Sequence, residues 1–109
     1  MKQLDLNKYR TKIGKNYSRV FTGRDRGADV REKSKIDDLF SEDGLEVTIP
    51  NEIFSITPSF LEELFKNIVL EHGKQRTLDN VKFIGQYDIQ GSFEEAINRI
   101  LQQKTGLEV

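Results

Sequence analysis

Three short segments of the chain have the hydrophobic pattern of β-strands. Residues 2–6 and 45–49 alternate apolar and polar side chains, which is the period of a strand with one buried face. Pro50 ends the second segment, because proline has no amide proton to donate to a neighbouring strand. Residues 81–85, with the sequence VKFIG, are predicted to form a third, buried strand.

The strongest pattern in the chain predicts a helix over residues 58–72. Apolar side chains and one histidine recur there at helical spacing: Phe60, Leu61, Leu64, Phe65, Ile68, Val69 and His72. Pro58 fits the first position of a helix, and Gly73 fits the residue just past its end. We expect His72 to be partly buried in the last turn.

Two further helices are predicted on either side of this central helix. In residues 91–106, Ser92 and Glu95 have the spacing of a capping box and Gly106 ends the helix. One face of that helix is apolar: Phe93, Ala96, Ile97, Ile100 and Leu101. The other helix is predicted from Thr22, its expected N-cap, to about residue 34.

The segment before Thr22 has a weaker pattern. Residues 7–21 are basic and irregular, which leaves a hairpin and an ordered loop as alternatives. The helix that follows has a narrow apolar face, so we expect it to rest on the surface of the domain.

The order of these elements predicts an α/β fold. Strand, helix, strand and helix in succession imply crossovers between parallel strands and a sheet against which the helices pack. A chain of 109 residues suits a single domain. We expect one domain over residues 1–109, with a small mixed sheet of about four strands. Its core is expected at about residues 20–103, after a basic strand and loop in residues 1–19.

Charge is divided unevenly along the chain. The 17 basic and 18 acidic residues give a net charge of -1, so the whole molecule is not an obvious partner for a polyanion. The first 40 residues hold 11 basic and 6 acidic side chains, whereas the remaining 69 hold 6 and 12. The N-terminal part is therefore positive and the rest is negative.

Composition excludes several kinds of site. The chain has no cysteine, which excludes a disulfide, a thiolate nucleophile and a zinc–thiolate cluster. His72 is the single histidine, which excludes a pair of histidine metal ligands. The first residues lack the apolar run of a signal peptide, and no apolar run is long enough to span a membrane. We expect a cytoplasmic, non-enzymatic protein without cofactor, metal or membrane association.

The stretch SITPSFLEELF places two hydroxyl side chains at the start of the central helix. Thr57 is favoured over Ser59 as the N-cap, because Pro58 then takes the first helical position. In that structural role, which the spacing favours, the hydroxyl contributes on the order of 1 kcal/mol to the stability of the helix. The free amides of this tip, expected to be open to solvent, can also hold a phosphate on Thr57 or Ser59. Such a phosphate would add charge to a surface that Glu62 and Glu63 are expected to make acidic.

Three stretches carry a resemblance to a known family. They are FTGRDRGADVREK, the run VTIPNEIFSITPSFLEELFKNIVLEHG and the segment VKFIG, and the resemblance that they carry spans roughly residues 20–101. They resemble the bacterial STAS-like domain family of unknown function, which is related to the STAS domains of anti-sigma factor antagonists. The resemblance implies a regulatory signal-transduction module that binds another protein, such as a histidine-kinase-type ATPase or a serine kinase.

The resemblance also implies a place for a phosphorylation switch. In the antagonists the central helix opens with Asp-Ser-Ser-Gly, and the first of these serines is phosphorylated. The sequence ITPSFL puts Pro58 at that serine, so a switch is carried over only by moving it to Thr57 or Ser59. The start of the central helix is, on this resemblance, the surface that meets the partner.

The basic N-terminal segment offers a different class of function. Arg24, Arg26 and Gly27 lie in the stretch GRDRG, which can hold phosphates because arginine donates two hydrogen bonds at once and glycine lets amides approach. The chain would then bind a nucleic acid or a phosphorylated ligand. Pairing of the two arginines with Asp25, Asp29 or the acidic second half of the chain is the favoured interpretation.

Overall fold

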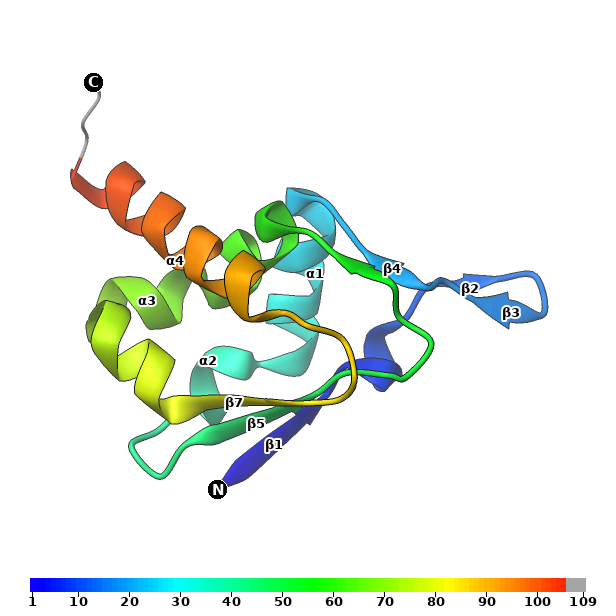
Figure 1. Cartoon of the computed structure of the whole chain (residues 1–109), viewed down its shortest axis with the longest axis horizontal. Coiled ribbons are helices and arrows are strands. Elements are labelled where there is room, and N and C mark those ends of the chain that lie inside the picture. Colours follow the sequence, from blue (N-terminus) through cyan, green and yellow to red (C-terminus); the bar gives the residue numbers. More distant parts are fainter. Residues whose placement is uncertain (106–109) are drawn as a thin grey trace.

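The main sheet of the fold has three parallel strands in the order β1-β5-β7 (Figure 1). They are β1 (Lys2–Asp5), β5 (Leu45–Thr48) and β7 (Val81–Ile84), which are the three predicted segments. A computed structural model describes the backbone of residues 1–105 and the side chains of residues 1–103. The predicted α/β class is confirmed, with three strands in the main sheet where about four were expected.

The helices lie on one side of this sheet (Figure 1). Within residues 1–105 the α-helices are α1 (Arg24–Ser34), α2 (Ile36–Leu39), α3 (Pro58–Asn80) and α4 (Gln90–Thr105). Aromatic rings of Phe65, Phe83 and Phe93 join α3, β7 and α4, with ring centroids 4.9 to 6.1 Å apart. Among these helices, none is both long and apolar enough to cross a membrane.

The central helix α3 begins as predicted and runs further than predicted. Thr57 is its N-cap, and the hydroxyl of Thr57 accepts a hydrogen bond from the amide of Phe60 at 3.4 Å. Gly73 interrupts the helix with a φ of 84°, so the first segment ends where the sequence indicated. A second segment then continues to Asn80, and its first turn is held by a hydrogen bond from the hydroxyl of Thr77 to the carbonyl of Gly73.

Two predicted helix starts are wrong. The N-cap of α1 is Gly23 instead of Thr22, and no side chain caps that helix. The helix α4 begins two residues before Ser92, so the predicted capping box of Ser92 and Glu95 lies inside it. The reason is Ile89, which is buried and accepts the first helical hydrogen bond, from the amide of Phe93. The predicted end of this helix at Gly106 lies outside the described residues.

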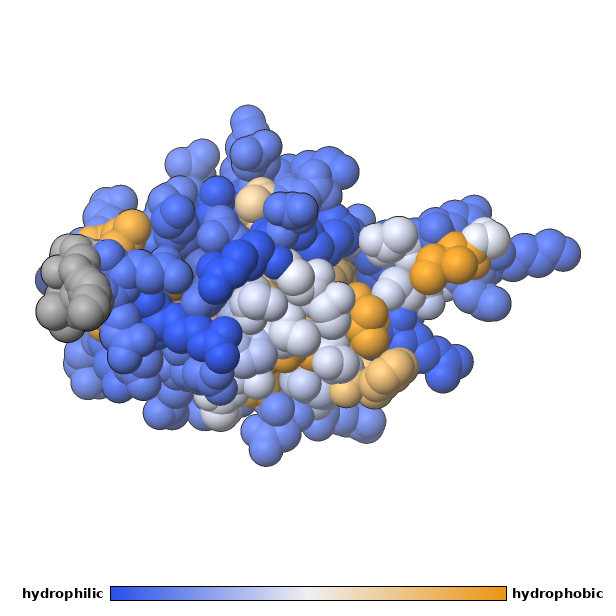
Figure 2. All heavy atoms as spheres, turned by 90° about the horizontal axis from the view of Figure 1, so that it is seen from above, coloured by the Kyte–Doolittle hydropathy of each residue, from blue (hydrophilic) through white to orange (hydrophobic). Residues whose placement is uncertain are grey.

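The N-terminal segment forms a hairpin, one of the two predicted alternatives. After the short 3-10 helix η1 (Leu6–Tyr9), strands β2 (Lys12–Ile13) and β3 (Asn16–Tyr17) pair antiparallel and project from the body of the fold (Figure 1). Figure 2 shows apolar residues on the surface of this projecting end. Leu4 and Leu6, in the segment before the expected core of residues 20–103, are buried in the hydrophobic core.

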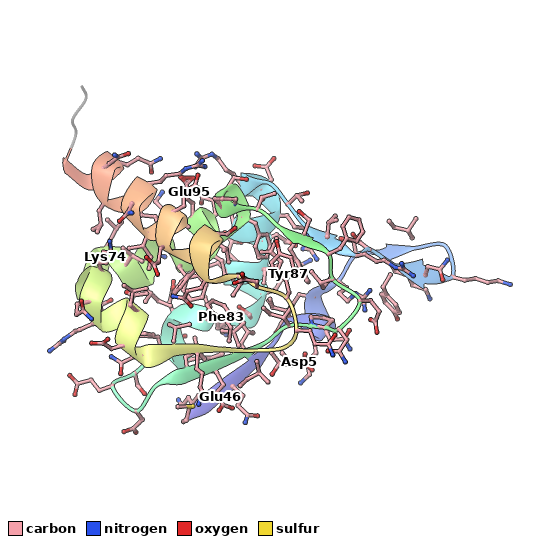
Figure 3. All side chains as sticks on the ribbon, viewed as in Figure 1. Asp5, Glu46, Lys74, Phe83, Tyr87 and Glu95 are labelled. Atoms are coloured by element: carbon pink, nitrogen blue, oxygen red, sulfur yellow. The ribbon has the colours of Figure 1, made fainter. Side chains whose placement is uncertain are left out.

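The two faces of the main sheet differ in burial. The register aligns Leu4, Val47 and Phe83 in one row, which packs in the core. The adjacent row is Gln3, Glu46 and Lys82, whose side chains point to the opposite face and are exposed or half-buried. Figure 3 shows Phe83 directed toward the helices and Glu46 directed away from them. The strand β7 is the last strand in the sheet order, and one of its faces is exposed. This corrects the prediction of a buried strand.

Candidate functional site

Two helix N-termini meet at one end of the fold. Strands β4 (Val20–Phe21) and β6 (Ser55–Ile56) form a parallel pair, and each leads into a helix, β4 into α1 and β6 into α3. Because paired parallel strands run in the same direction, the two helices begin side by side. The amide of Gly23 donates to the hydroxyl of Thr57 at 3.3 Å. We call this place the helix mouth, formed by Thr22, Gly23, Arg24, Thr57 and Ser59.

The two hydroxyls predicted as modification sites have different surroundings. The Thr57 hydroxyl accepts hydrogen bonds from the amides of Gly23 and Phe60 and shares a further one, 3.1 Å long, with the hydroxyl of Ser59. For Ser59, that contact is its side chain's sole hydrogen bond with any described residue. Both residues are half-buried. Ser59 therefore has the more available hydroxyl, whereas Thr57 is committed to joining the two helix starts.

A buried carboxylate lies directly below the helix mouth. Glu62 is only 2% exposed, and its Oε2 lies 2.7 Å from Nη1 of Arg24. Nη2 of Arg24 also donates to Oε1 of Glu62 at 3.4 Å. The expectation of an exposed acid at this position is therefore wrong for Glu62. The long side chain of Arg24, which is 50% exposed, thus reaches from α1 to this buried carboxylate on α3.

A second ion pair holds α1 against α3 about two turns further along α1. Nη1 of Arg31 lies 3.2 Å from Oε1 of Glu63 and also donates to the carbonyl oxygen of Glu63. Glu63 is in addition 3.9 Å from Arg24. The two adjacent glutamates thus act as a pair of anchors for α1 and contribute little acidic surface.

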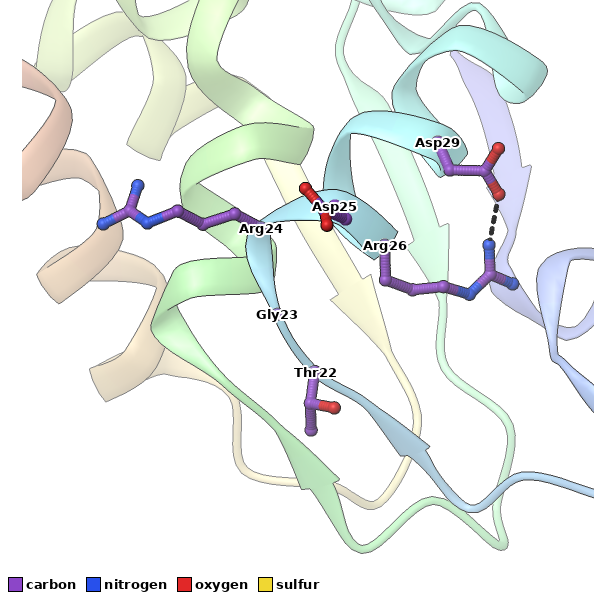
Figure 4. Close-up of a pocket in the computed structure, with 6 residues that line it drawn as sticks. All are labelled: Thr22, Gly23, Arg24, Asp25, Arg26 and Asp29. Atoms are coloured by element: carbon purple, nitrogen blue, oxygen red, sulfur yellow. Dashed lines mark hydrogen bonds and ion pairs between the residues drawn. The ribbon is translucent and has the colours of Figure 1, made fainter.

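The predicted anion cluster of Arg24, Arg26 and Gly27 is not brought together. Figure 4 shows that Arg24 and Arg26 extend in opposite directions from the first turn of α1. Arg26 pairs with Asp29 at 2.6 Å and donates to the carbonyl of Tyr9. Both arginines are thus paired with carboxylates of the chain itself, as the favoured interpretation of the sequence expected.

Gly27 has a packing role. It is buried where α1 crosses α3, and a Cβ atom at this position would overlap the carbonyl oxygen of Phe60. Its amide donates to the carbonyl of Gly23 at 3.2 Å. The amide is therefore used within the helix. Gly27 also faces α3, whereas binding of an anion would require it to face solvent.

A hollow of about 560 Å³ lies over the first turn of α1 (Figure 4). Its lining is Thr22, Gly23, Arg24, Asp25, Arg26 and Asp29. Because two carboxylates and two guanidinium groups line it together, the hollow carries no excess of positive charge. This balance does not favour capture of a free anion.

The remaining candidate of the sequence, His72, lies away from the helix mouth. Its ring packs against Phe40, with centroids 4.7 Å apart, and it is partly buried as predicted. Among the residues that the structure describes, no group of three or more histidine, aspartate or glutamate side chains is placed to hold a metal ion.

The pairing of β4 with β6 was missed in the sequence, although a signal for it is present. The stretches VFTG and SITP both place a short strand, a threonine and then the start of a helix in the same order.

Comparison of the chain with protein-family models, with curated proteins and with solved structures finds no match. The functional conclusion therefore depends on the geometry above, together with the resemblance in the sequence.

Proposed function

We propose that this chain is a non-catalytic, STAS-like regulatory domain that acts by binding another protein, with the helix mouth as part of the contact surface. The observation that carries the proposal is Phe54, which is 68% exposed immediately before β6. The other six phenylalanines are buried or partly buried. Aromatic side chains are enriched in the contact centres of protein interfaces, so Phe54 beside the helix mouth supports a partner surface there.

The distance between Phe54 and the helix mouth suits one contact surface. An extended chain rises about 3.3 Å per residue, so Phe54 and Thr57 are about 10 Å apart. The surface has a fixed shape, because the amide of Thr57 donates to the carbonyl of Phe21 and the amide of Phe54 donates to that of Arg19. A partner can therefore meet a largely preformed site, which lowers the entropy lost on binding.

The helix mouth is less open than the sequence indicated. Gly23 contacts Thr57, and Arg24 lies across Glu62, so the start of α3 is partly covered by the start of α1. The surface offered to a partner is therefore formed by the first turns of both helices. The sequence indicated a surface formed by the free amides of α3 alone.

Ser59 is the residue through which this contact would be regulated. A phosphate there adds up to about two negative charges one turn before Glu62 in α3, and so competes with Glu62 for the half-exposed guanidinium of Arg24. Competition for that guanidinium would loosen α1 from α3 and change the shape of the surface. The partner implied by the sequence resemblance is a histidine-kinase-type ATPase or a serine kinase.

We expect Phe54→Ala and Ser59→Glu each to weaken partner binding about tenfold or more, and Ser59→Ala to leave it unchanged. The chain is used as bait in an extract of its own source cells, bound proteins are identified by mass spectrometry, and the affinity of the purified partner is measured by calorimetry. Ile84→Ala is the matched control, because Ile84 is also an exposed apolar side chain but lies on β7. Binding that is the same for Phe54→Ala, Ser59→Glu and Ile84→Ala contradicts the proposal.

A further inference from the structure

The hairpin carries basic side chains that have no partner within the described structure. Residues 6–20 hold five basic side chains and no acidic one. Arg10 of this set is paired with a carboxylate, whereas Lys12, Lys15 and Arg19 form no ion pair with any residue of the described part of the chain. Their charge is therefore available to something outside the molecule.

The register of the hairpin decides which side chains share a face. Lys12 lies opposite Tyr17, and Ile13 lies opposite Asn16. Residues directly opposite each other in an antiparallel pair point to the same face, and the face alternates along a strand. Tyr17 and Lys12 therefore share one face, and Ile13 points to the other.

Phe54 extends this face beyond the hairpin. Its amide donates to the carbonyl of Arg19 at 3.0 Å, which continues the pairing of β4 with β6 by one residue. Tyr17 is 52% exposed and Phe54 is 68% exposed. We call the surface formed by Lys12, Lys15, Tyr17, Arg19 and Phe54 the hairpin face.

A hollow of about 460 Å³ at the border of the hairpin face, which shares Lys15, Tyr17 and Arg19 with it, already holds one carboxylate. Its lining is Arg10, Lys15, Asn16, Tyr17, Arg19 and Glu52. Oε1 of Glu52 lies 2.8 Å from Nη1 of Arg10, whose guanidinium carbon is 5.5 Å from the centre of the Tyr17 ring. This intramolecular pair shows that the hollow accepts a carboxylate beside an aromatic ring. Lys15 and Arg19 form no ion pair with any described residue and can therefore bind further carboxylates.

We infer that the hairpin face binds an acidic segment of a protein partner. Carboxylates of that segment pair with Lys12, Lys15 and Arg19, and its apolar side chains pack on Tyr17 and Phe54. Tyrosine, phenylalanine and arginine are among the residues enriched in the contact centres of protein interfaces. The inference rests on the proposed function and specifies the chemistry of the partner.

A short acidic peptide fits this face better than a nucleic acid does. The chain has a net charge of -1, and its last 69 residues hold 12 acidic side chains, which repel a long polyanion. One face of the Tyr17 ring is also occupied by the guanidinium of Arg10, which leaves less of the ring for stacking on a base.

The test is selection of a random dodecapeptide phage library on the intact chain, followed by anisotropy measurements with an enriched peptide. We expect enriched peptides to combine aspartate or glutamate with leucine or phenylalanine. Phe54→Ala, and a variant with Lys12→Ser, Lys15→Ser and Arg19→Ser together, should each weaken binding about tenfold or more. Ile13→Ser, an exposed apolar position on the opposite face of the hairpin, should change it less than about twofold.

Several outcomes overturn the inference. One is enrichment of peptides without acidic residues, and another is an equal loss of affinity in Ile13→Ser and Phe54→Ala. Tighter binding of a single-stranded oligonucleotide than of the best peptide, falling steeply with salt, would identify the hairpin face as a nucleic-acid site. If binding of a native partner is weakened by Ser59→Glu but not by the triple basic variant, this inference is wrong and the proposed function stands. If Ser59→Glu leaves partner binding unchanged while acidic peptides still bind the hairpin face, the helix mouth is not the contact surface and this inference is supported.

Discussion

Replacing Gly27 with alanine is expected to lower the free energy of unfolding by about 3 kcal/mol. In most helices the same change is stabilising by up to about 1 kcal/mol, because glycine loses more backbone freedom on folding. Here the new Cβ atom would overlap the carbonyl oxygen of Phe60 and lie 3.0 Å from the Cβ atom of Glu63. Relief of that overlap requires α1 to move away from α3, which also lengthens the ion pairs between the two helices.

The measurement is urea unfolding followed by circular dichroism, with the slope of the transition compared between variants. Gly91→Ala is the matched control, because Gly91 lies in α4 and a Cβ atom there would meet nothing within 4 Å. We expect that variant to be as stable as the parent or slightly more stable. If Gly27→Ala behaves in the same way as Gly91→Ala, the close packing of α1 on α3 is wrong.

Replacing Arg24 with methionine is expected to lower the free energy of unfolding by about 3 kcal/mol. The substitution keeps much of the side-chain volume but leaves the carboxylate of Glu62, which is 2% exposed, without its cation. An unpaired buried charge is far more costly than the loss of a surface ion pair. The expected loss is at the lower end for a buried pair, because Arg24 is itself 50% exposed.

A second ion pair of the chain provides the control. Arg99 pairs with Glu95 on the exposed face of α4, and Arg99→Met is expected to cost less than about 1 kcal/mol. Combining Arg24→Met with Glu62→Met removes both charges and should recover most of the stability lost by Arg24→Met alone. Equal losses for Arg24→Met and Arg99→Met, or no recovery in the double variant, would show that the Arg24–Glu62 pair does not hold the helix mouth together.

The elements with a long apolar period could be predicted from the sequence. The strand predicted at residues 45–49 is present as β5 (Leu45–Thr48), and α3 has the predicted N-cap Thr57, because burial of one face imposes the spacing that the pattern shows. Strands β4 and β6 have two residues each, which is too short to show a period. They became visible only through their pairing with each other.

The roles of individual site residues depended on contacts between distant parts of the chain. Glu62 and Glu63 look alike in the sequence, and only the position of Arg24, 38 residues before Glu62, makes the first of them buried. From the sequence, Gly27 was predicted to be a flexible residue of a phosphate-binding stretch. The structure shows instead that α3 packs against it. The hairpin face also joins residues from two separate segments, so no local pattern could indicate it.

Hydrogen–deuterium exchange of the chain with and without its purified partner tests the proposed contact surface most directly. We predict slower amide exchange on binding at the helix mouth and the strand before it, in residues 22–24 and 54–60, with little change in β1 and β5. Protection confined to the open face or the edge strands of the main sheet, with no change at the helix mouth, would contradict the account.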